Sequence, residues 1–284
     1  MKERKAVPEL LSREPESPEN GGTTQVIAVF SGKGGVGKTL LAINIAATLA
    51  DGKHADVALM DLDLQFGDVA VLMGVEPPAT LYDVAREYPH VDAAKLIAMM
   101  PEGAGGVRVL ASPMSPELAD LITSEHVEAV IGLLKEAFDF VVLDCSSHLD
   151  DRVLEALETA DQIVLITDLD LPAIKDAKLA LRLFESLKIP RDHIKLVINR
   201  ADAPAITTIE QVEKHLGLAV AVLIPSQGKQ VLKSLQDEIP IVIQAPKAQI
   251  SLKIGELVSA LVPLPETAKG RSSRKGSWPR PGGS

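Results

Sequence analysis

The sequence predicts an α/β protein with a doubly wound, mainly parallel sheet that carries helices on both faces. Short apolar runs alternate with longer amphipathic segments from residue 25 to residue 262, and strands that alternate with helices build parallel sheets through right-handed crossovers. Hydrophobic residues make up 46% of the 284 residues but aromatic residues only 3%. The core must therefore consist of Val, Ile, Leu and Ala, as is typical of parallel strands buried on both faces.

The expected elements follow one another in a regular order. The strand candidates are apolar runs rich in Val, Ile and Leu: 25–30, 56–60, 107–110, 140–144, 162–167, 194–199 and 219–223. The helix candidates are longer: 38–50, 115–137, 150–159, 172–187, 207–216, 227–236 and 248–261. Since all strands are expected to be parallel, their carboxyl ends meet at one edge of the sheet, where ligands bind in open α/β folds.

The two ends of the chain differ in composition from its centre. Residues 1–24 are rich in Glu, Pro and Ser and are predicted to be a disordered leader, and residues 263–284 are predicted to be a disordered basic tail. The tail is either a solvated extension or a segment that touches anionic lipid or nucleic acid. Residues 25–262 between them are expected to form one domain, because single α/β domains reach roughly 250 residues.

Charge and cysteine content limit the class of protein. The net charge is −10, which disfavours nucleic acid as the main partner because phosphate binding needs a basic surface. Cys145 is the only cysteine, which excludes an internal disulfide and fits a reducing cytoplasm. No apolar run is long enough for a transmembrane helix. We therefore expect a soluble, cytoplasmic protein.

The segment 31–40, SGKGGVGKTL, lies between the first expected strand and the first expected helix. Its Gly32 and Gly37-Lys38-Thr39 fit the phosphate-loop pattern G-x-x-x-x-G-K-[ST]. Glycines let backbone amides approach the phosphates, and the start of the helix adds the positive end of its dipole. Lys38 is expected to reach the β- and γ-phosphates and Thr39 to bind Mg²⁺. The alternative is a glycine-rich turn without a ligand.

Acidic residues stand at the carboxyl ends of two other strands. Asp61 and Asp63 follow the strand 56–60, and Asp144 ends the strand 140–144. Asp144 is expected to contact Mg²⁺ through water, and Asp61 to support the Mg²⁺ shell or Lys38. The alternative for the Asp61–Asp63 pair is turn formation and helix capping. Cys145 lies next to this site, but no histidine is placed to activate it, and we expect a small buried residue.

The stretch KGGVGKT resembles the deviant Walker A motif of the MinD/ParA superfamily of ATPases, and the resemblance extends over residues 25–262. It implies ATP and Mg²⁺ as ligands, hydrolysis to ADP and phosphate that is slow and stimulated by a partner, and an ATP-dependent homodimer. In such a dimer Lys33 contacts the phosphates held by the other subunit, like an arginine finger. With Lys38 and Asp63, which positions the attacking water in the family, Lys33 completes the expected catalytic set.

The same resemblance implies a nucleotide site with a defined set of residues. Asn199 would hydrogen-bond the adenine, with capping of a turn as its alternative, and Pro225 would begin the loop that contacts the base. No N-K-x-D guanine motif is present, so ATP is preferred over GTP. The phosphate-binding set is Gly32, Lys33, Gly34, Gly35, Val36, Gly37, Lys38, Thr39 and Leu40.

The sequence departs from the family pattern in two places. Leu40 stands where relatives often have a second Thr, so a hydroxyl contact worth about 0.5–1.5 kcal/mol is lost. After Asp144 the family often has prolines, whereas Cys145, Ser146 and Ser147 stand here. This second departure leaves the shape of that segment open.

The stretch DLDLQFGDVAVLMG resembles the CpaE/TadZ branch, which assembles Flp-type pili. This implies pilus-assembly or polar-localisation partners and recruitment to the inner membrane face or the cell pole. A MinD-like regulator of division or flagellar placement would instead bind membrane through a C-terminal helix, but the helix 248–261 is poor in cations and is expected to pack on the core. A ParA-like DNA partition protein is disfavoured by the acidic charge. A scaffold that binds ATP without hydrolysing it is disfavoured by Lys38, Asp63 and Asp144.

Overall fold

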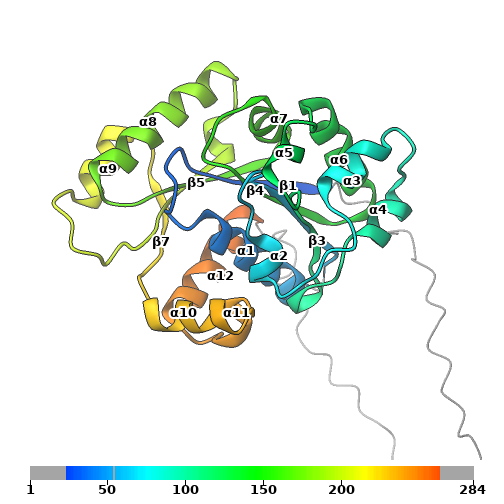
Figure 1. Cartoon of the computed structure of the whole chain (residues 1–284). Coiled ribbons are helices and arrows are strands. Elements are labelled where there is room, and N and C mark those ends of the chain that lie inside the picture. The colour runs from blue at the N-terminus through cyan, green and yellow to red at the C-terminus, as the bar shows by residue number, and fades with distance from the viewer. Residues whose placement is uncertain (1–23, 54, 263–284) are drawn as a thin grey trace, which may run out of the picture.

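The computed structural model describes residues 24–53 and 55–262 (Figure 1). Its seven strands form one sheet with the order β3-β2-β4-β1-β5-β6-β7, and every neighbouring pair is parallel. The strands are β1 (Gln25–Phe30), β2 (Val57–Leu62), β3 (Arg108–Leu110), β4 (Phe140–Cys145), β5 (Gln162–Thr167), β6 (Ile194–Ile198) and β7 (Val220–Leu223). The predicted tail 263–284, and the predicted leader apart from Thr24, lie outside the described residues.

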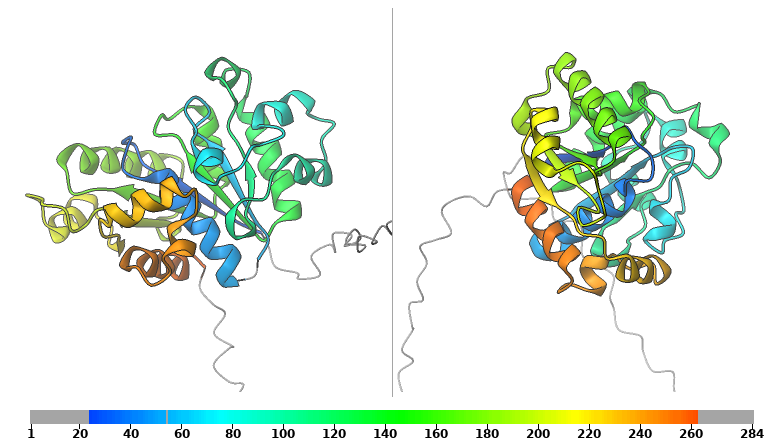
Figure 2. Two further views of the ribbon diagram at one scale, coloured as in Figure 1. Left: turned by 60° about the horizontal axis from the view of Figure 1, so that its bottom comes forward. Right: turned by 90° about the vertical axis from the view of Figure 1, so that its left-hand side faces the viewer.

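Helices cover both faces of the sheet, as Figures 1 and 2 show, and the predicted doubly wound fold is confirmed. Most of the helices from α3 to α9 bury their apolar residues on one face, and α1, α11 and α12 bury theirs on the other. The helices are α1 (Lys38–Lys53), α2 (Val69–Leu72), α3 (Leu81–Glu87), α4 (Ala93–Met99), α5 (Pro116–Ala119), α6 (Ser124–Ala137), α7 (Asp151–Thr159), α8 (Leu171–Ser186), α9 (Ile209–Leu216), α10 (Gly228–Gln236), α11 (Ile241–Gln244) and α12 (Gln249–Leu261), with short 3-10 turns at Ala104–Gly106 and Arg191–His193.

After its first residue, Gln25, the central strand β1 is apolar, and its place in the sheet shows why. Successive side chains of a strand point to opposite faces. Val26 and Phe30 therefore belong to the core on one face, and Ile27 and Val29 to the core on the other. All four are fully buried. The strand order places β1 in the middle of the sheet, so the glycine-rich loop at its carboxyl end has β4 on one side and β5 on the other.

The last helix, α12, packs on the core as expected. Its residues Ile250, Ile254, Leu257 and Leu261 are buried in the same core as the apolar residues of α1, and the two helices lie side by side in Figure 2. The apolar face of α12 is thus used inside the protein. Among the described residues, no helix has both the length and the apolar character that crossing a bilayer requires.

Two of the differences from the expected boundaries have a clear physical cause in the structure. The segment 115–137 is not one helix, because α5 ends at Ala119 and α6 begins at Ser124. Thr123 caps α6: its hydroxyl accepts the N–H of His126, whose ring nitrogen accepts the N–H of Thr123. In addition, β2 continues two residues beyond the predicted end, because its Asp61 still pairs with β4.

Candidate functional site

The carboxyl ends of β1, β2, β4 and β6 carry polar residues that the sequence singled out, and the end of β5 carries further ones. The glycine-rich loop follows β1. Acidic residues of β2 and β4 lie on one side of the loop, and polar residues that follow β5 and β6 lie on the other. The site is therefore built around a central loop with acidic groups on both flanks.

The loop itself needs glycine at two positions. Gly35 and Gly37 have φ angles of 75° and 96°, a left-handed conformation that residues with a Cβ avoid. A Cβ on Gly37 would also lie 2.6 Å from the side-chain nitrogen of Asn199. Between them Val36 is buried in the core beneath the loop, so the loop is anchored by its one apolar side chain.

Lys38 and Thr39 begin α1, directly behind the loop. Lys38 is buried to 9% exposure and makes no ion pair within the described residues. Most of the Lys38 side chain is shielded from solvent, but its ammonium group is not among the buried polar atoms without a partner, so it stays accessible to a ligand. The arrangement therefore fits a lysine whose partner is a bound anion.

Asp144, at the end of β4, is buried without a hydrogen bond of good geometry to either carboxylate oxygen. This burial raises the pKa of Asp144 to about 7, although the nearby Thr39 hydroxyl and the Lys38 ammonium act in the opposite direction. Buried acceptors in proteins are nearly always paired. Two orphaned oxygens beside a threonine hydroxyl therefore fit a site that is completed by a cation.

Asp61 lies in β2 directly opposite Asp144 in β4. It is fully buried, and its oxygens accept the N–H groups of Asp63 at 3.0 Å and of Val69 at 3.2 Å. Burial raises the pKa of Asp61 well above its usual range, and the charge of Asp144 adds to this. The carboxylate thus holds the loop 63–69 in place. Gly67 packs directly against it, and a Cβ there would overlap the Asp61 carboxylate.

Asp63 is half-buried just beyond the end of β2. Its charge is close enough to Asp144 to help raise the pKa of that residue. Within the described residues no hydrogen bond is made by the Asp63 carboxylate, which is thus available to a ligand or a water. The structure brings Asp63, Asp61, Asp144, Lys38 and Thr39 together at one end of the sheet, as the sequence predicted.

These residues fit Mg²⁺ only if phosphate oxygens share it. Among the described residues, no group of three His, Cys, Asp or Glu side chains could hold a metal ion by itself. Mg²⁺ is commonly held by one or two carboxylates together with substrate phosphates and water. Thr39 and the orphaned oxygens of Asp144 can supply the protein's share of such a shell.

Lys33 is turned toward its own chain. Its ammonium group contacts the carboxylate of Asp170 and lies 3.4 Å from that of Asp168. The hydrogen bond to Asp170 raises the pKa of Lys33 and lowers that of Asp170. Sequence reasoning missed both aspartates, although they follow the carboxyl end of β5 just as Asp63 follows β2.

Asn199 and Pro225 lie on the other flank of the loop. The Asn199 side chain donates to the carbonyl of Val36 at 2.7 Å, so the structure brings Asn199 to the phosphate loop. Pro225 follows Ile224, whose N–H donates to Ile198 of β6 at 2.9 Å. Arg200, which the sequence analysis did not single out, also touches the loop.

Cys145 is fully buried, and burial raises the pKa of its thiol well above the usual range. His148, three residues later, is exposed. The expectation of a small buried residue is confirmed, since a thiol that keeps its proton is a poor nucleophile.

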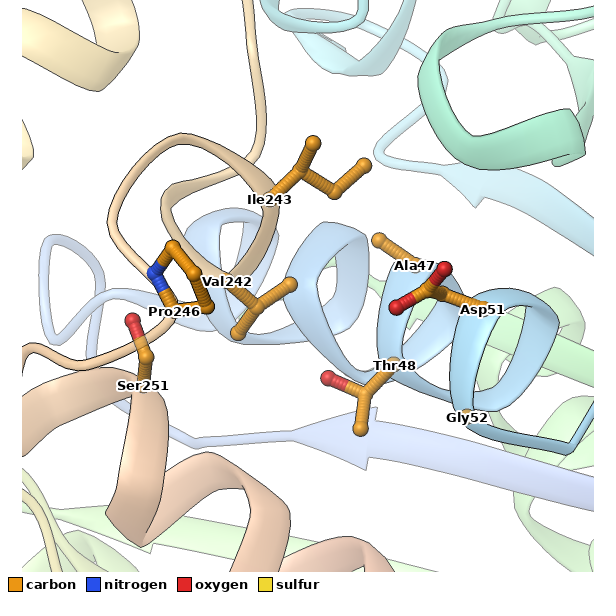
Figure 3. A pocket seen from close by; sticks show the side chains of 8 residues that line it. All are labelled: Ala47, Thr48, Asp51, Gly52, Val242, Ile243, Pro246 and Ser251. Atoms are coloured by element: carbon orange, nitrogen blue, oxygen red, sulfur yellow. The ribbon is translucent and has the colours of Figure 1, made fainter.

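A separate hollow lies at the far end of α1, between that helix and α11 and α12 (Figure 3). Its volume is about 130 Å³, and its lining is mainly apolar or small, including Ala47, Val242, Ile243 and Pro246. Ligand pockets generally measure ~300–1,000 Å³. This hollow is therefore too small for a nucleotide and does not compete with the loop as the candidate site.

Comparison with known proteins agrees with this geometry. Residues 27–241 match the CobQ/CobB/MinD/ParA nucleotide binding domain. An uncharacterized ATP-binding protein of Methanocaldococcus jannaschii is 27% identical over 239 residues, which cover 83% of this chain and 87% of the relative. The septum site-determining protein MinD of a Synechocystis species is 26% identical over 228 residues, which cover 78% of this chain and 82% of the relative.

The crystal structure of a ParA family ATPase from Chlorobium tepidum superposes with a TM-score of 0.78 at 26% identity, covering 83% of this chain and 98% of that one. The chain thus shares its fold with a ParA family ATPase of related sequence. Because the matched domain spans most of the chain, this chain belongs to the CobQ/CobB/MinD/ParA nucleotide binding domain family.

Proposed function

We propose that this protein is an ATPase that acts as an ATP-dependent dimerising switch. The observation that carries the proposal is a glycine-rich loop beside two groups: Lys38, which makes no ion pair within the described residues, and the orphaned oxygens of Asp144. A magnesium–triphosphate complex would satisfy both. Similarity to an ATP-binding protein and to a ParA family ATPase supports ATP as the nucleotide.

In this proposal each residue has a limited task. Lys38 would bind the β- and γ-phosphate oxygens, while Thr39 and Asp144 would hold Mg²⁺, whose charge would offset that of the phosphates. Asp63 orients the attacking water. The water oxygen bonds to the γ-phosphorus as the bond to the ADP oxygen breaks. ADP leaves with that electron pair, and one proton of the water passes to an oxygen of the released phosphate. Catalysis thus depends on positioning and charge stabilisation rather than on a covalent intermediate.

Dimerisation gives Lys33 a new partner. Its ion pairs with Asp168 and Asp170 are partly exposed, with 29% of the Lys33 side chain and 46% of the Asp170 side chain accessible. Such pairs are typically worth about 0–1 kcal/mol. Lys33 can therefore leave them at small cost and contact the phosphates bound by the other subunit.

The segments after Asp63 and Asp144 are the proposed switches. Phe66 and Val71 are 76% and 65% exposed in the first segment, and Leu149 is 40% exposed in the second. Contacts with the γ-phosphate would order these segments, and hydrolysis would release them. Their exposed apolar side chains are suited to binding a partner protein in one nucleotide state only.

Calorimetric titration with MgATP tests the assignment of the loop. We expect the Lys38→Ala variant to lose nucleotide binding, whereas Lys135→Ala, an exposed lysine on α6, should bind as the wild type does. Near-normal affinity of the Lys38 variant would contradict the proposal.

The Asp63→Ala variant should bind ATP but remain a dimer. If light scattering finds it monomeric with ATP, the water-orienting role is wrong.

The cellular role is proposed from sequence pattern alone. The stretch 61–74 favours Flp-type pilus assembly, which places the protein in the cytoplasm with recruitment to the inner membrane face or the cell pole. Similarity to MinD and to a ParA family ATPase keeps division control and DNA partition as alternatives. An affinity pull-down with the Asp63→Ala variant separates the three. Pilus-assembly proteins support the first role, lipid co-sedimentation the second and chromosomal DNA the third.

A further inference from the structure

Asn199 and Arg200, the two residues that follow β6, contact the glycine-rich loop from the side on which β6 lies. The Asn199 side chain donates to the carbonyl of Val36 at 2.7 Å, and the Arg200 guanidinium donates to the carbonyl of Gly35 at 3.2 Å. The Asn199 amide is itself fixed, because its oxygen accepts the backbone N–H of Arg200 at 2.9 Å. Its nitrogen is thereby left facing the loop.

These contacts determine how the loop's peptide groups point. In a trans peptide the carbonyl and the N–H lie on opposite sides. Because the carbonyls of Gly35 and Val36 point to β6, the N–H groups of Val36 and Gly37 point away from it. Within the described residues, these two N–H groups make no hydrogen bond of normal geometry. Successive free amides that point to one side form a concavity that binds anions.

The backbone on both sides is adapted to this contact. Arg200 has a φ of 50°, a left-handed conformation that is unfavourable for a residue with a Cβ and is found mainly where the surroundings enforce it. The next N–H, that of Ala201, is held by the carbonyl of Ile224 at 2.9 Å. Opposite it, Gly37 has no Cβ to obstruct Asn199. The contact thus depends on unusual backbone geometry at two separate places in the chain.

We propose that Asn199 and Arg200 are positioning residues for the nucleotide's phosphates, since they preset the peptide groups whose N–H donors bind them. The inference rests on the proposed function, because it takes the loop as the phosphate site. It gives Asn199 a role on the loop that is separate from the adenine contact implied by the family resemblance. It also assigns a role to Arg200, which no motif marks.

Calorimetry with two ligands separates the phosphate role from a contact with the base: MgATP, and magnesium tripolyphosphate, which lacks the nucleoside. Loss of one hydrogen bond that orders the loop should weaken binding roughly three- to tenfold. We expect Asn199→Ala and Arg200→Ala to weaken both ligands by the same factor. The matched control is Arg191→Ala, whose exposed guanidinium also donates to a glycine carbonyl, that of Gly217 at 2.9 Å, away from the loop.

The outcomes are distinct. Weaker binding of MgATP with unchanged binding of tripolyphosphate would show a contact with the nucleoside and overturn the inference. Unchanged binding of both ligands would overturn it as well. If the wild-type protein binds neither ligand, the proposed function itself fails. Should Arg200→Ala not fold, Arg200→Gly removes the guanidinium while allowing the same φ angle, and the same equal loss for both ligands is expected.

Discussion

Replacing Asp144 by asparagine should make the ligand-free protein more stable above neutral pH. The carboxylate is buried without a hydrogen bond of good geometry to either oxygen, and its burial raises the pKa from 3.8 to about 7. The folded state therefore holds the proton more tightly than the unfolded state does. The stabilising effect of that proton is complete below pH ~4 and is lost as the pH rises to about 7.

The size of the effect follows from the same two pKa values. At ~1.4 kcal/mol for each pH unit, the rise in the pKa of Asp144 corresponds to a penalty of about 4 kcal/mol once the carboxylate is ionised. The asparagine amide is also buried without a partner, which costs about 1–3 kcal/mol. We therefore expect Asp144→Asn to raise the free energy of unfolding by about 2 kcal/mol at pH 8. The gain over the wild type should shrink steadily toward pH 5.

Urea unfolding followed by circular dichroism, in EDTA and without nucleotide, measures this difference. The quantity of interest is the free energy of unfolding of the variant minus that of the wild type at pH 5, 6, 7 and 8, which cancels the titration of groups that do not interact with Asp144. Glu128→Gln, at an exposed position on α6, serves as the control and should show no such trend. A difference that does not change with pH, or a variant less stable at pH 8, would refute the argument.

Other predictions concern the loop and its surroundings. Lys33→Ala should bind MgATP but stay monomeric in analytical ultracentrifugation, whereas Asp170→Asn should lower the ATP-dependent dimer dissociation constant a few-fold because it frees Lys33. Gly67→Ala should lower the free energy of unfolding by about 1–3 kcal/mol in denaturant titrations, since its Cβ overlaps the Asp61 carboxylate. Leu40→Thr should tighten ATP binding about two- to tenfold by calorimetry if the added hydroxyl reaches the phosphates.

The fold was predictable because the central strands are buried on both faces. The interior of a strand such as β1 or β5 must then be apolar, and in each one an unbroken apolar run follows the first glutamine. The short helices α2, α3 and α4 were not predicted, since segments of four to seven residues are too short to show a helical period. The break before α6 was missed because its cap pairs Thr123 with a histidine rather than the usual Glu or Gln.

The site was predictable only in part, because the sequence shows which polar residues follow strands but not which of them face the glycine-rich loop. Lys38, Thr39 and Asp144 belong to patterns that combine residue type with position at a strand end. Arg200 and Asp170 also follow strands, but polar residues there are common, and only the folded chain shows which of them turn toward the loop. For Asp61, the sequence predicted the position of the residue but only one of its roles. The sequence places it beside the metal, and the structure shows its oxygens also holding the backbone of the loop 63–69.

The orphaned oxygens of Asp144 link stability to function in a way that can be measured. Suppose that these oxygens lower the stability of the ligand-free protein because their partner is a bound cation. Asp144→Asn, which should stabilise the protein in EDTA, must then also reduce the stabilisation that Mg²⁺ gives. MgATP should raise the melting temperature of the wild type, since a ligand that binds only the folded state stabilises it. It should raise that of Asp144→Asn much less, and ATP with EDTA should affect both alike. A variant that gains stability in EDTA yet keeps the full response to MgATP would exclude Asp144 as a metal ligand while leaving its burial cost intact.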